Sequence, residues 1–137
     1  MKSRTPVVFA AISFAIISVI HGVGAPSAAP WNAPASAAAK KNPFAGKADA
    51  VVAGKQTFAT TCVPCHGSGG RGDGPAAVAL NPKPANYTTS AISAESDGSL
   101  FWKLSEGRGA MVGFKATLSE KQRWELISYI RTLQGKK

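Results

Sequence analysis

The chain has 137 residues, and its 16 Lys and Arg against 7 Asp and Glu give a formal net charge of +9. This length suits one domain, and a hydrophobic share of 45% excludes an acidic, intrinsically disordered chain. Cys62 and Cys65 are the only cysteines, which excludes a scaffold of several disulfides and a four-cysteine zinc ribbon. The composition therefore indicates one small, basic, globular domain.

The N-terminal segment has the features of an export signal. Lys2 and Arg4 precede an uncharged apolar run, residues 7–20, which is 14 residues long. A membrane-spanning helix needs roughly 20 apolar residues, so the run fits the apolar part of a secretory signal better than a stable span. We expect a signal peptide over residues 1–25, with cleavage as late as residue 37, and a periplasmic protein. The alternative is an uncleaved segment that anchors the domain to a membrane.

The next segment, residues 26–46, is rich in alanine and proline. Proline interrupts helices and removes backbone donors, so the segment is predicted to be a flexible linker or a pro-region. Trp31 lies within it without apolar neighbours at helical spacing, and no role for it follows from the sequence. The folded domain is expected over residues 47–137.

A first helix is predicted over residues 49–60. It begins with an acid, Asp49, in the first turn, where the helix dipole favours negative charge. Val51, Gly54 and Phe58 fall on one face at helical spacing. A glycine on that face would let another helix approach closely.

The motif that follows carries the chemistry. Residues 62–66 read Cys-Val-Pro-Cys-His, which is the attachment signature of c-type haem. Two thiols three positions apart on one helical turn can each form a thioether with a vinyl group of the same porphyrin. The adjacent His66 then reaches the iron from one side. Covalent attachment retains the cofactor in a domain too small to enclose it otherwise, so we expect one covalent haem c with its iron.

Two other uses of this cysteine pair, a redox-active disulfide and a zinc site, fit the sequence less well. A redox-active disulfide usually lies in a βαβ context, and no such context is visible in this sequence. A zinc site needs a third and a fourth ligand, and the domain adds only His66 and carboxylates to the two thiols. The sequence therefore favours haem attachment.

A glycine-rich stretch follows the motif. Residues 67–72 fit the dinucleotide pattern G-x-G-x-x-G literally, but that fingerprint needs a strand before it and a helix at its end. The residues before it are the haem motif and Pro75 follows closely, so nucleotide binding is rejected. Glycine, proline and asparagine recur over residues 67–90, which predicts loops rather than regular structure.

Met111 is the candidate for the second axial ligand. It is the only methionine besides Met1, and it lies in a glycine-rich loop, residues 107–114, after a short helix expected around residues 100–104. Once the signal is removed, His66 is the only histidine. Thioether ligation opposite an imidazole raises the reduction potential and closes the coordination sphere, which leaves electron transfer. A methionine that only fills the core, a Lys or Asn ligand, and an open site are the alternatives.

The C-terminal helix is the clearest element. Ser119 and Gln122 can form a capping box, and apolar residues including Leu126 and Tyr129 then follow at a spacing typical of one helix face. No stretch of the chain alternates convincingly between apolar and polar residues as a strand would. The fold class is therefore predicted to be all-α, with three to four helices around one haem.

From about Lys47 to Gln134 the chain resembles a class I cytochrome c of the single-haem bacterial type. The resemblance rests on the first helix with its glycine and phenylalanine, the attachment motif, the sequences Gly72-Asp73-Gly74-Pro75 and Leu80-Asn81-Pro82-Lys83-Pro84, the Met111 loop and the aromatic C-terminal helix. One departure concerns the residue after the methionine, which is often proline in the family and is Val112 here. This departure predicts a less rigid loop.

The resemblance implies specific contacts. The first helix should cross the last near Leu126 and Tyr129. The carbonyl of Pro75 should accept a hydrogen bond from the ring nitrogen of His66 that does not face the iron. Tyr87 should be a neighbour of the haem propionates. The resemblance implies that Trp102 and Arg71 are also neighbours of the haem propionates.

The expected function is single-electron transfer, without transformation of a substrate. Because the basic residues are scattered and the protein is expected to be exported, we expect acidic redox partner proteins rather than nucleic acid. Such partners would be a dehydrogenase, an oxidase or a cytochrome complex, and contact with a membrane is expected only if the N-terminal segment is uncleaved. The alternatives are a haem-based ligand sensor or small peroxidase with a labile sixth site, and a cytochrome subunit of a larger oxidoreductase complex.

Overall fold

A computed structural model of the protein describes residues 30–135, so the predicted signal peptide over residues 1–25 lies outside the described part. The elements follow in the order α1 (Ala35–Ala38), α2 (Ala48–Thr61), α3 (Val63–His66), the 3-10 helix η1 (Pro75–Ala79), α4 (Ser90–Ala94), α5 (Asp97–Glu106) and α6 (Glu120–Leu133). Between residues 30 and 135 there is no strand, only an isolated bridge between Arg108 and Met111. The prediction of an all-α fold is confirmed.

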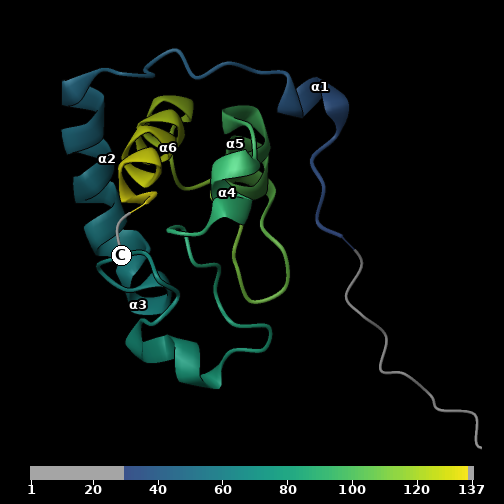
Figure 1. Ribbon diagram of the computed structural model, residues 1–137, viewed down its shortest axis with the longest axis vertical. Coiled ribbons are helices and arrows are strands. Elements are labelled where there is room, and N and C mark those ends of the chain that lie inside the picture. Colours follow the sequence, from purple (N-terminus) through teal and green to yellow (C-terminus); the bar gives the residue numbers. More distant parts are fainter. Residues whose placement is uncertain (1–29, 136–137) are drawn as a thin grey trace, which may run out of the picture.

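Helices α2 and α6 cross at close range and form the frame of the domain (Figure 1). A Cβ atom placed on Gly54 would overlap with the carbonyl oxygen of Glu125 and would lie 3.0 Å from the Cβ of Tyr129. Phe58, one turn further along α2, meets the Tyr129 ring edge-to-face with centroids 5.2 Å apart. The predicted crossing near Tyr129 is confirmed, and the absent side chain of Gly54 is what allows it.

Helix α6 begins where the sequence predicts. The Ser119 hydroxyl accepts a hydrogen bond from the Gln122 amide at 3.2 Å, and the Gln122 side chain accepts one from the Ser119 amide at 2.9 Å. This reciprocal pair satisfies two amides that the first turn would otherwise leave without partners. Leu126 and Ile127 then lie fully buried in the core.

Helix α5 is longer than the short helix expected around residues 100–104, because its N-terminus is capped. The Ser96 hydroxyl accepts a hydrogen bond from the Ser99 amide at 3.1 Å, so the helix starts at Asp97. The Asp97 carboxylate in turn accepts from Arg131 Nε of α6 at 2.6 Å, which ties the two helices together.

Residues 30–47, which we call the N-terminal strap, differ from the predicted flexible linker because they pack against the domain. The buried Asn42 donates through Nδ2 to Ser128 Oγ at 2.9 Å, and the Ser96 hydroxyl donates to the Ala38 carbonyl at 2.7 Å. A Cβ on Gly98 of α5 would overlap with a carbonyl oxygen of α1. Figure 1 shows the strap passing over the ends of α5 and α6 on its way to α2.

Among the residues that the structure describes, no helix combines the length and the apolar character needed to cross a membrane.

Candidate functional site

The attachment motif lies where α2 gives way to the short helix α3. The Cys62 amide still donates to the Phe58 carbonyl of α2 at 2.9 Å, and the Cys62 carbonyl accepts from the His66 amide at 2.8 Å. Pro64 near the start of α3 suits this position, because the first turn of a helix does not use its amide. Cys62, Cys65 and His66 therefore project from one helical turn.

The two cysteines are free thiols, Cys62 buried and Cys65 half-buried. Burial, with a smaller contribution from the neighbouring Cys65, raises the pKa of the Cys62 thiol to about 12. A thiol with a raised pKa stays protonated at neutral pH and is a poor redox nucleophile. This environment makes the Cys62 thiol a poor starting point for thiol–disulfide exchange.

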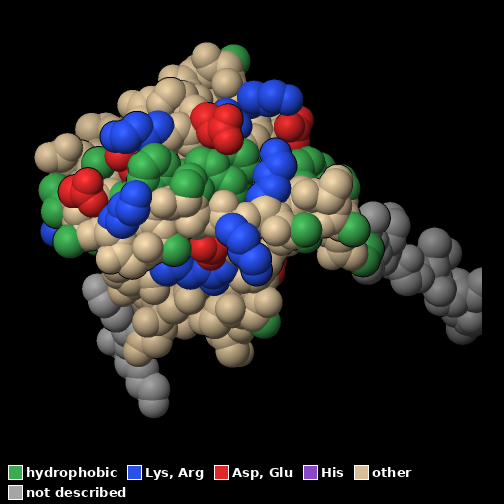
Figure 2. Space-filling view, turned by 90° about the horizontal axis from the view of Figure 1, so that it is seen from above, with side chains coloured by type: hydrophobic (Ala, Val, Ile, Leu, Met, Phe, Trp, Pro, Cys, Tyr) green, Lys and Arg blue, Asp and Glu red, His purple; other side chains and the backbone are tan. Residues whose placement is uncertain are grey.

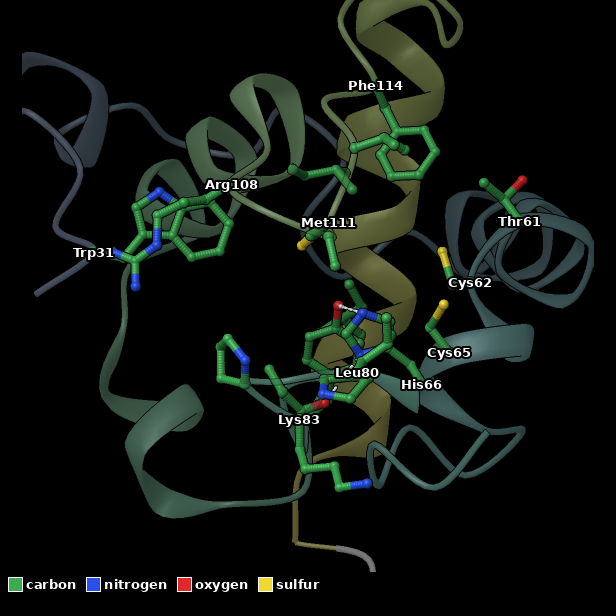
Figure 3. A pocket seen from close by; sticks show the side chains of 18 residues that line it. Trp31, Thr61, Cys62, Cys65, His66, Leu80, Lys83, Arg108, Met111 and Phe114 are labelled. Atoms are coloured by element: carbon green, nitrogen blue, oxygen red, sulfur yellow. Dashed lines mark hydrogen bonds between the residues drawn. The ribbon is translucent and has the colours of Figure 1, made fainter. Parts of the chain in front are cut away.

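The motif lines an open cavity of about 380 Å³. Figure 3 shows Cys62, Cys65 and His66 on one side of the view, Trp31 and Arg108 on the other, and the Met111 side chain between them. Most of the remaining lining is apolar, contributed by Leu80, Pro82, Pro84, Leu104, Phe114 and Ile130. The cavity thus brings two thiols, an imidazole and a thioether into an apolar setting.

His66 is buried and held by a backbone carbonyl. Its Nδ1 lies 3.0 Å from the carbonyl oxygen of Ala85, and since a carbonyl only accepts, Nδ1 carries the proton. Burial lowers the pKa of His66, and the Ala85 hydrogen bond opposes this shift. The neutral imidazole therefore keeps a lone pair on Nε2, which is the form that binds a metal.

The acceptor for Nδ1 corrects the expectation drawn from the resemblance. Pro75 was expected to supply this carbonyl, but the structure pairs Nδ1 with Ala85 instead. Pro75 is the exposed first residue of η1 and does not line the cavity. The chain between Pro84 and Tyr87 returns to the attachment motif, which places the Ala85 carbonyl beside the imidazole.

Tyr87 is the aromatic neighbour of His66. Its ring stacks on the imidazole with centroids 4.6 Å apart, and its hydroxyl donates to Nε2 at 3.3 Å. Burial raises the pKa of Tyr87, so the phenol keeps its proton. The lone pair of Nε2 is thus available to an electron acceptor, and a metal at Nε2 would replace the tyrosine hydroxyl there.

Met111 is carried by the loop of residues 107–114, which we call the methionine loop. The Arg108 amide donates to the Met111 carbonyl at 2.8 Å, and the Met111 amide donates back at 3.1 Å. The Phe114 amide donates to the Leu104 carbonyl of α5 at 3.0 Å, which closes the loop on that helix. This arrangement holds the half-buried Met111 side chain at the cavity.

The structure brings together five of the predicted site residues and not the other three. Cys62, Cys65, His66, Met111 and Tyr87 line one cavity.

The remaining three predicted residues do not line it: Pro75, Trp102 and Arg71. Trp102 instead lines a separate cavity of about 170 Å³ beside Arg123, because its position on α5 faces away from the motif. Arg71 is exposed in the loop between two glycines with positive φ. Neither side chain is therefore placed to contact a group held in the main cavity.

Sequence reasoning missed several residues at the cavity. Arg108 and Lys83 line it from loops, and Trp31 lines it from the N-terminal strap. The closeness of Arg108 to Met111 in the chain was a usable signal. Trp31 offered none, because its place depends on the packing of the strap against distant helices.

The residues present fit a covalently bound haem. The cavity offers two thiols for attachment, one thioether, an apolar lining and one imidazole whose Nε2 lone pair contacts only the Tyr87 hydroxyl, which a metal could replace. Within residues 30–135 no group of three His, Cys, Asp or Glu side chains could hold a metal ion, so a zinc site gains no support there.

Comparison with known proteins agrees with this chemistry. Residues 49–130 match the protein family described as cytochrome c oxidase, cbb3-type, subunit III. The matched region covers more than half of the chain and includes both the attachment motif and Met111. No curated protein sequence matches the chain significantly.

Several solved structures are similar. One is that of the reducing HAO-like protein complex of Kuenenia stuttgartiensis, with 27% identity, a TM-score of 0.57, and 64% of this chain and 45% of that chain covered. Cytochrome CL from the marine methylotrophic bacterium Methylophaga aminisulfidivorans has 25% identity and a TM-score of 0.50, with 67% and 58% covered. A c-type cytochrome with 20% identity and a TM-score of 0.52, with 59% and 96% covered, shares the fold.

This chain spans about half the length of the first two of these structures, at 45% and 58%. Together, the family match, the shared fold and the attachment motif show that the chain belongs to the c-type cytochromes, in the family described as cytochrome c oxidase, cbb3-type, subunit III, and has the all-α cytochrome c fold.

Proposed function

We propose that this c-type cytochrome is a single-electron carrier in which one haem is ligated by His66 and Met111. The observation that carries the proposal is that both side chains line the cavity into which the two cysteines project. The bound haem would supply the Fe(II)/Fe(III) couple. No substrate is transformed in this function.

The residues of the chain have distinct tasks in this proposal. Cys62 and Cys65 attach the group covalently, and the Ala85 carbonyl fixes the orientation of the His66 ring. Met111 supplies a thioether that favours the reduced state. The apolar lining, with residues such as Phe114, keeps water from the centre and lowers the local dielectric.

The test is an absorption spectrum combined with the intact mass of the exported protein. We expect a mass increased by one haem, the far-red band of the oxidised protein that marks methionine ligation in this family, and little binding of CO. The variant Met111→Ala should keep the mass increase, lose the band and bind CO. Val78→Ala, a change at an exposed valine of η1 that does not line the cavity, is the control and should keep the band.

Two results would contradict the proposal. A Met111→Ala protein that retains the far-red band would exclude Met111 as the ligand. A wild-type protein without the band that binds CO readily would favour the alternative of a ligand sensor or small peroxidase.

We further propose that the protein is exported to the periplasm and meets acidic redox partners there. Support for acidic partners comes from the net charge, which is still +7 without Lys2 and Arg4 of the signal (14 Lys and Arg against 7 Asp and Glu), and from Lys83 and Arg108, two exposed cations that line the cavity. Figure 2 shows that Lys and Arg side chains also spread over the face viewed there, with acidic side chains among them. Charge of this kind raises the rate of association without requiring tight binding.

The salt dependence of electron transfer tests this partner chemistry. The second-order rate with an acidic partner should fall steeply as salt is added, because screening weakens the attraction between exposed charges. Lys83→Gln should lower the rate at low salt and flatten this dependence. Lys55→Gln removes the same charge from an exposed site on α2 that does not line the cavity, and should change the rate less. A flat response in the wild type would exclude steering.

The similarity to a chain in the HAO-like protein complex supports a second candidate, a cytochrome subunit of a larger oxidoreductase. Stable co-purification with a dehydrogenase or oxidase from native membranes or periplasm would favour the subunit over a free carrier.

A further inference from the structure

The N-terminal strap reaches the cofactor cavity through Trp31. The Trp31 side chain lines the cavity together with Met111, although 80 positions separate the two in the sequence (111 − 31). Figure 3 shows the indole beside the Arg108 side chain at the edge of the cavity. A residue from the segment expected to be a linker therefore forms part of the functional site.

Two cations contact the Trp31 ring. The guanidinium carbon of Arg108 lies 5.3 Å from the ring centroid, and the Lys103 ammonium lies 5.6 Å from it. Both distances fall within the range of cation–π attraction. Lys103 is itself fixed by the Glu95 carboxylate at 2.6 Å, so the ring contacts a cation that is already held in place.

Arg108 connects Trp31 to the methionine. Its backbone exchanges two hydrogen bonds with Met111, at 2.8 and 3.1 Å, and forms the narrow base of the turn that carries the ligand. The glycines of the methionine loop give this turn little stiffness of its own. A contact that holds the Arg108 side chain therefore restrains the backbone on which Met111 sits.

The strap can act as such a restraint because it is fixed behind Trp31. The Ser96 hydroxyl holds the Ala38 carbonyl, and Asn42 is hydrogen-bonded to Ser128 at the buried face of α6. The close approach at Gly98 leaves no room for a side chain between α1 and α5. The segment that carries Trp31 is thus anchored to α5 and to α6.

We propose that Trp31 is a positioning residue for Met111, acting through Arg108, and that the N-terminal strap is part of the functional domain. The inference rests on the proposed ligation by Met111. Without the indole, the methionine loop would lose the contact between Arg108 and Trp31, and the Met111 sulfur would be held less firmly at the cavity. An added ligand for the iron would then compete with Met111 more effectively.

The experiment measures the affinity of imidazole for the oxidised holoprotein, together with the far-red band. Trp31→Ala should raise the imidazole affinity roughly tenfold, the size expected for loss of a partly desolvated cation–π contact. Trp31→Phe keeps an aromatic face and should give a smaller increase. Trp102→Ala removes the same side chain from a separate cavity beside Arg123 and should leave the affinity within about twofold, because Trp102 does not line the cavity that holds Met111.

A double-mutant cycle tests the route through Arg108. Arg108→Gln should itself raise imidazole affinity, and the double variant with Trp31→Ala should show less than the sum of the two effects. If Trp31→Ala does not yield folded holoprotein, Arg108→Gln decides the question, because it leaves the strap intact. Additive effects, or no effect of Arg108→Gln, would overturn the proposed route.

The failures of the two proposals are distinguishable. If the wild-type protein has no far-red band, ligation by Met111 fails, and the inference about Trp31 fails with it. If the band is present and Trp31→Ala leaves both the band and the imidazole affinity unchanged, only the inference about Trp31 is overturned.

Discussion

The two parts of the site that hold the cofactor differ in how they are built. Cys62, Cys65 and His66 project from one helical turn that continues α2, and α2 packs tightly on α6. Met111 instead sits on a loop closed by backbone hydrogen bonds to its own neighbours and to the end of α5. The attachment side is therefore part of the helical core, whereas the methionine loop is held at its ends and, by our inference, through Trp31.

This difference separates two physical requirements. Attachment needs groups at fixed local spacing, and a single turn of helix supplies that spacing. The proposed second ligand, Met111, comes from a distant part of the chain, so its position depends on packing that assembles only in the complete fold. We expect substitutions on the attachment side to act on the whole domain, and substitutions in the loop to act mainly on ligation.

The largest effect is expected from the cysteines. The double variant Cys62→Ala with Cys65→Ala should leave the exported polypeptide without covalently bound haem, because no other cysteine can form a thioether. Intact mass would show the polypeptide alone. Met111→Ala should by contrast keep the full mass increase. Loss of covalent haem in Met111→Ala would contradict the distinction between the attachment side and the methionine loop.

A smaller but global effect is expected at the helix crossing. Gly54→Ala forces a methyl group onto the Glu125 carbonyl and should lower the free energy of unfolding by about 1–3 kcal/mol, as overpacking of a tight contact does. Thermal unfolding of the holoprotein is the measurement. Gly69→Ala is the control, because a Cβ there would find its nearest atom at 3.8 Å and the backbone is not in the left-handed region. Equal effects of the two changes would contradict the packing argument.

The smallest effect on stability is expected at Gly109 of the methionine loop, which forms a matched pair with Gly107. Gly107 and Gly109 both have positive φ, 69° and 60°, but a Cβ on Gly107 would also lie 2.5 Å from the Met111 carbonyl oxygen, whereas Gly109 faces open space. Gly109→Ala should cost about 1 kcal/mol of unfolding free energy from backbone strain, and Gly107→Ala should cost more, because its methyl group also overlaps with backbone atoms.

The two loop variants should differ in ligation. Gly107→Ala should weaken the far-red band, because the methyl group displaces the backbone of the ligand residue, while Gly109→Ala should keep it. A band that is equally intense in both variants would show that the loop accommodates the methyl group without moving the sulfur.

Much of the fold could be predicted because its signals are local. The capping box at Ser119, the close approach at Gly54 and the position of the attachment motif each follow from residue types within a few positions of one another. The start of α5 could have been predicted too, since Ser96 and Asp97 are an ordinary N-terminal signal. The strap was misjudged as flexible because its alanines and prolines do not reveal the buried contacts of Asn42.

The site could be predicted only in part, because some of its residues are brought together by long-range packing rather than by a local sequence pattern. The motif identifies Cys62, Cys65 and His66 at once, and the scarcity of methionine points to Met111. The carbonyl that orients His66 was assigned to Pro75 and belongs to Ala85, because the path of a loop rich in proline and glycine is not encoded in any short pattern. Trp31 was left without a role because its partners lie on α5 and in the methionine loop.

The location of Trp31 also bears on how the N-terminus is processed. A signal peptidase that cuts after residue 25 would leave the indole and the whole strap on the secreted protein, whereas a cut after residue 37 would discard both Trp31 and most of α1. If the hydrophobic segment is instead retained, the chain from it would enter the described domain at residue 30, next to Trp31, which lines the cavity.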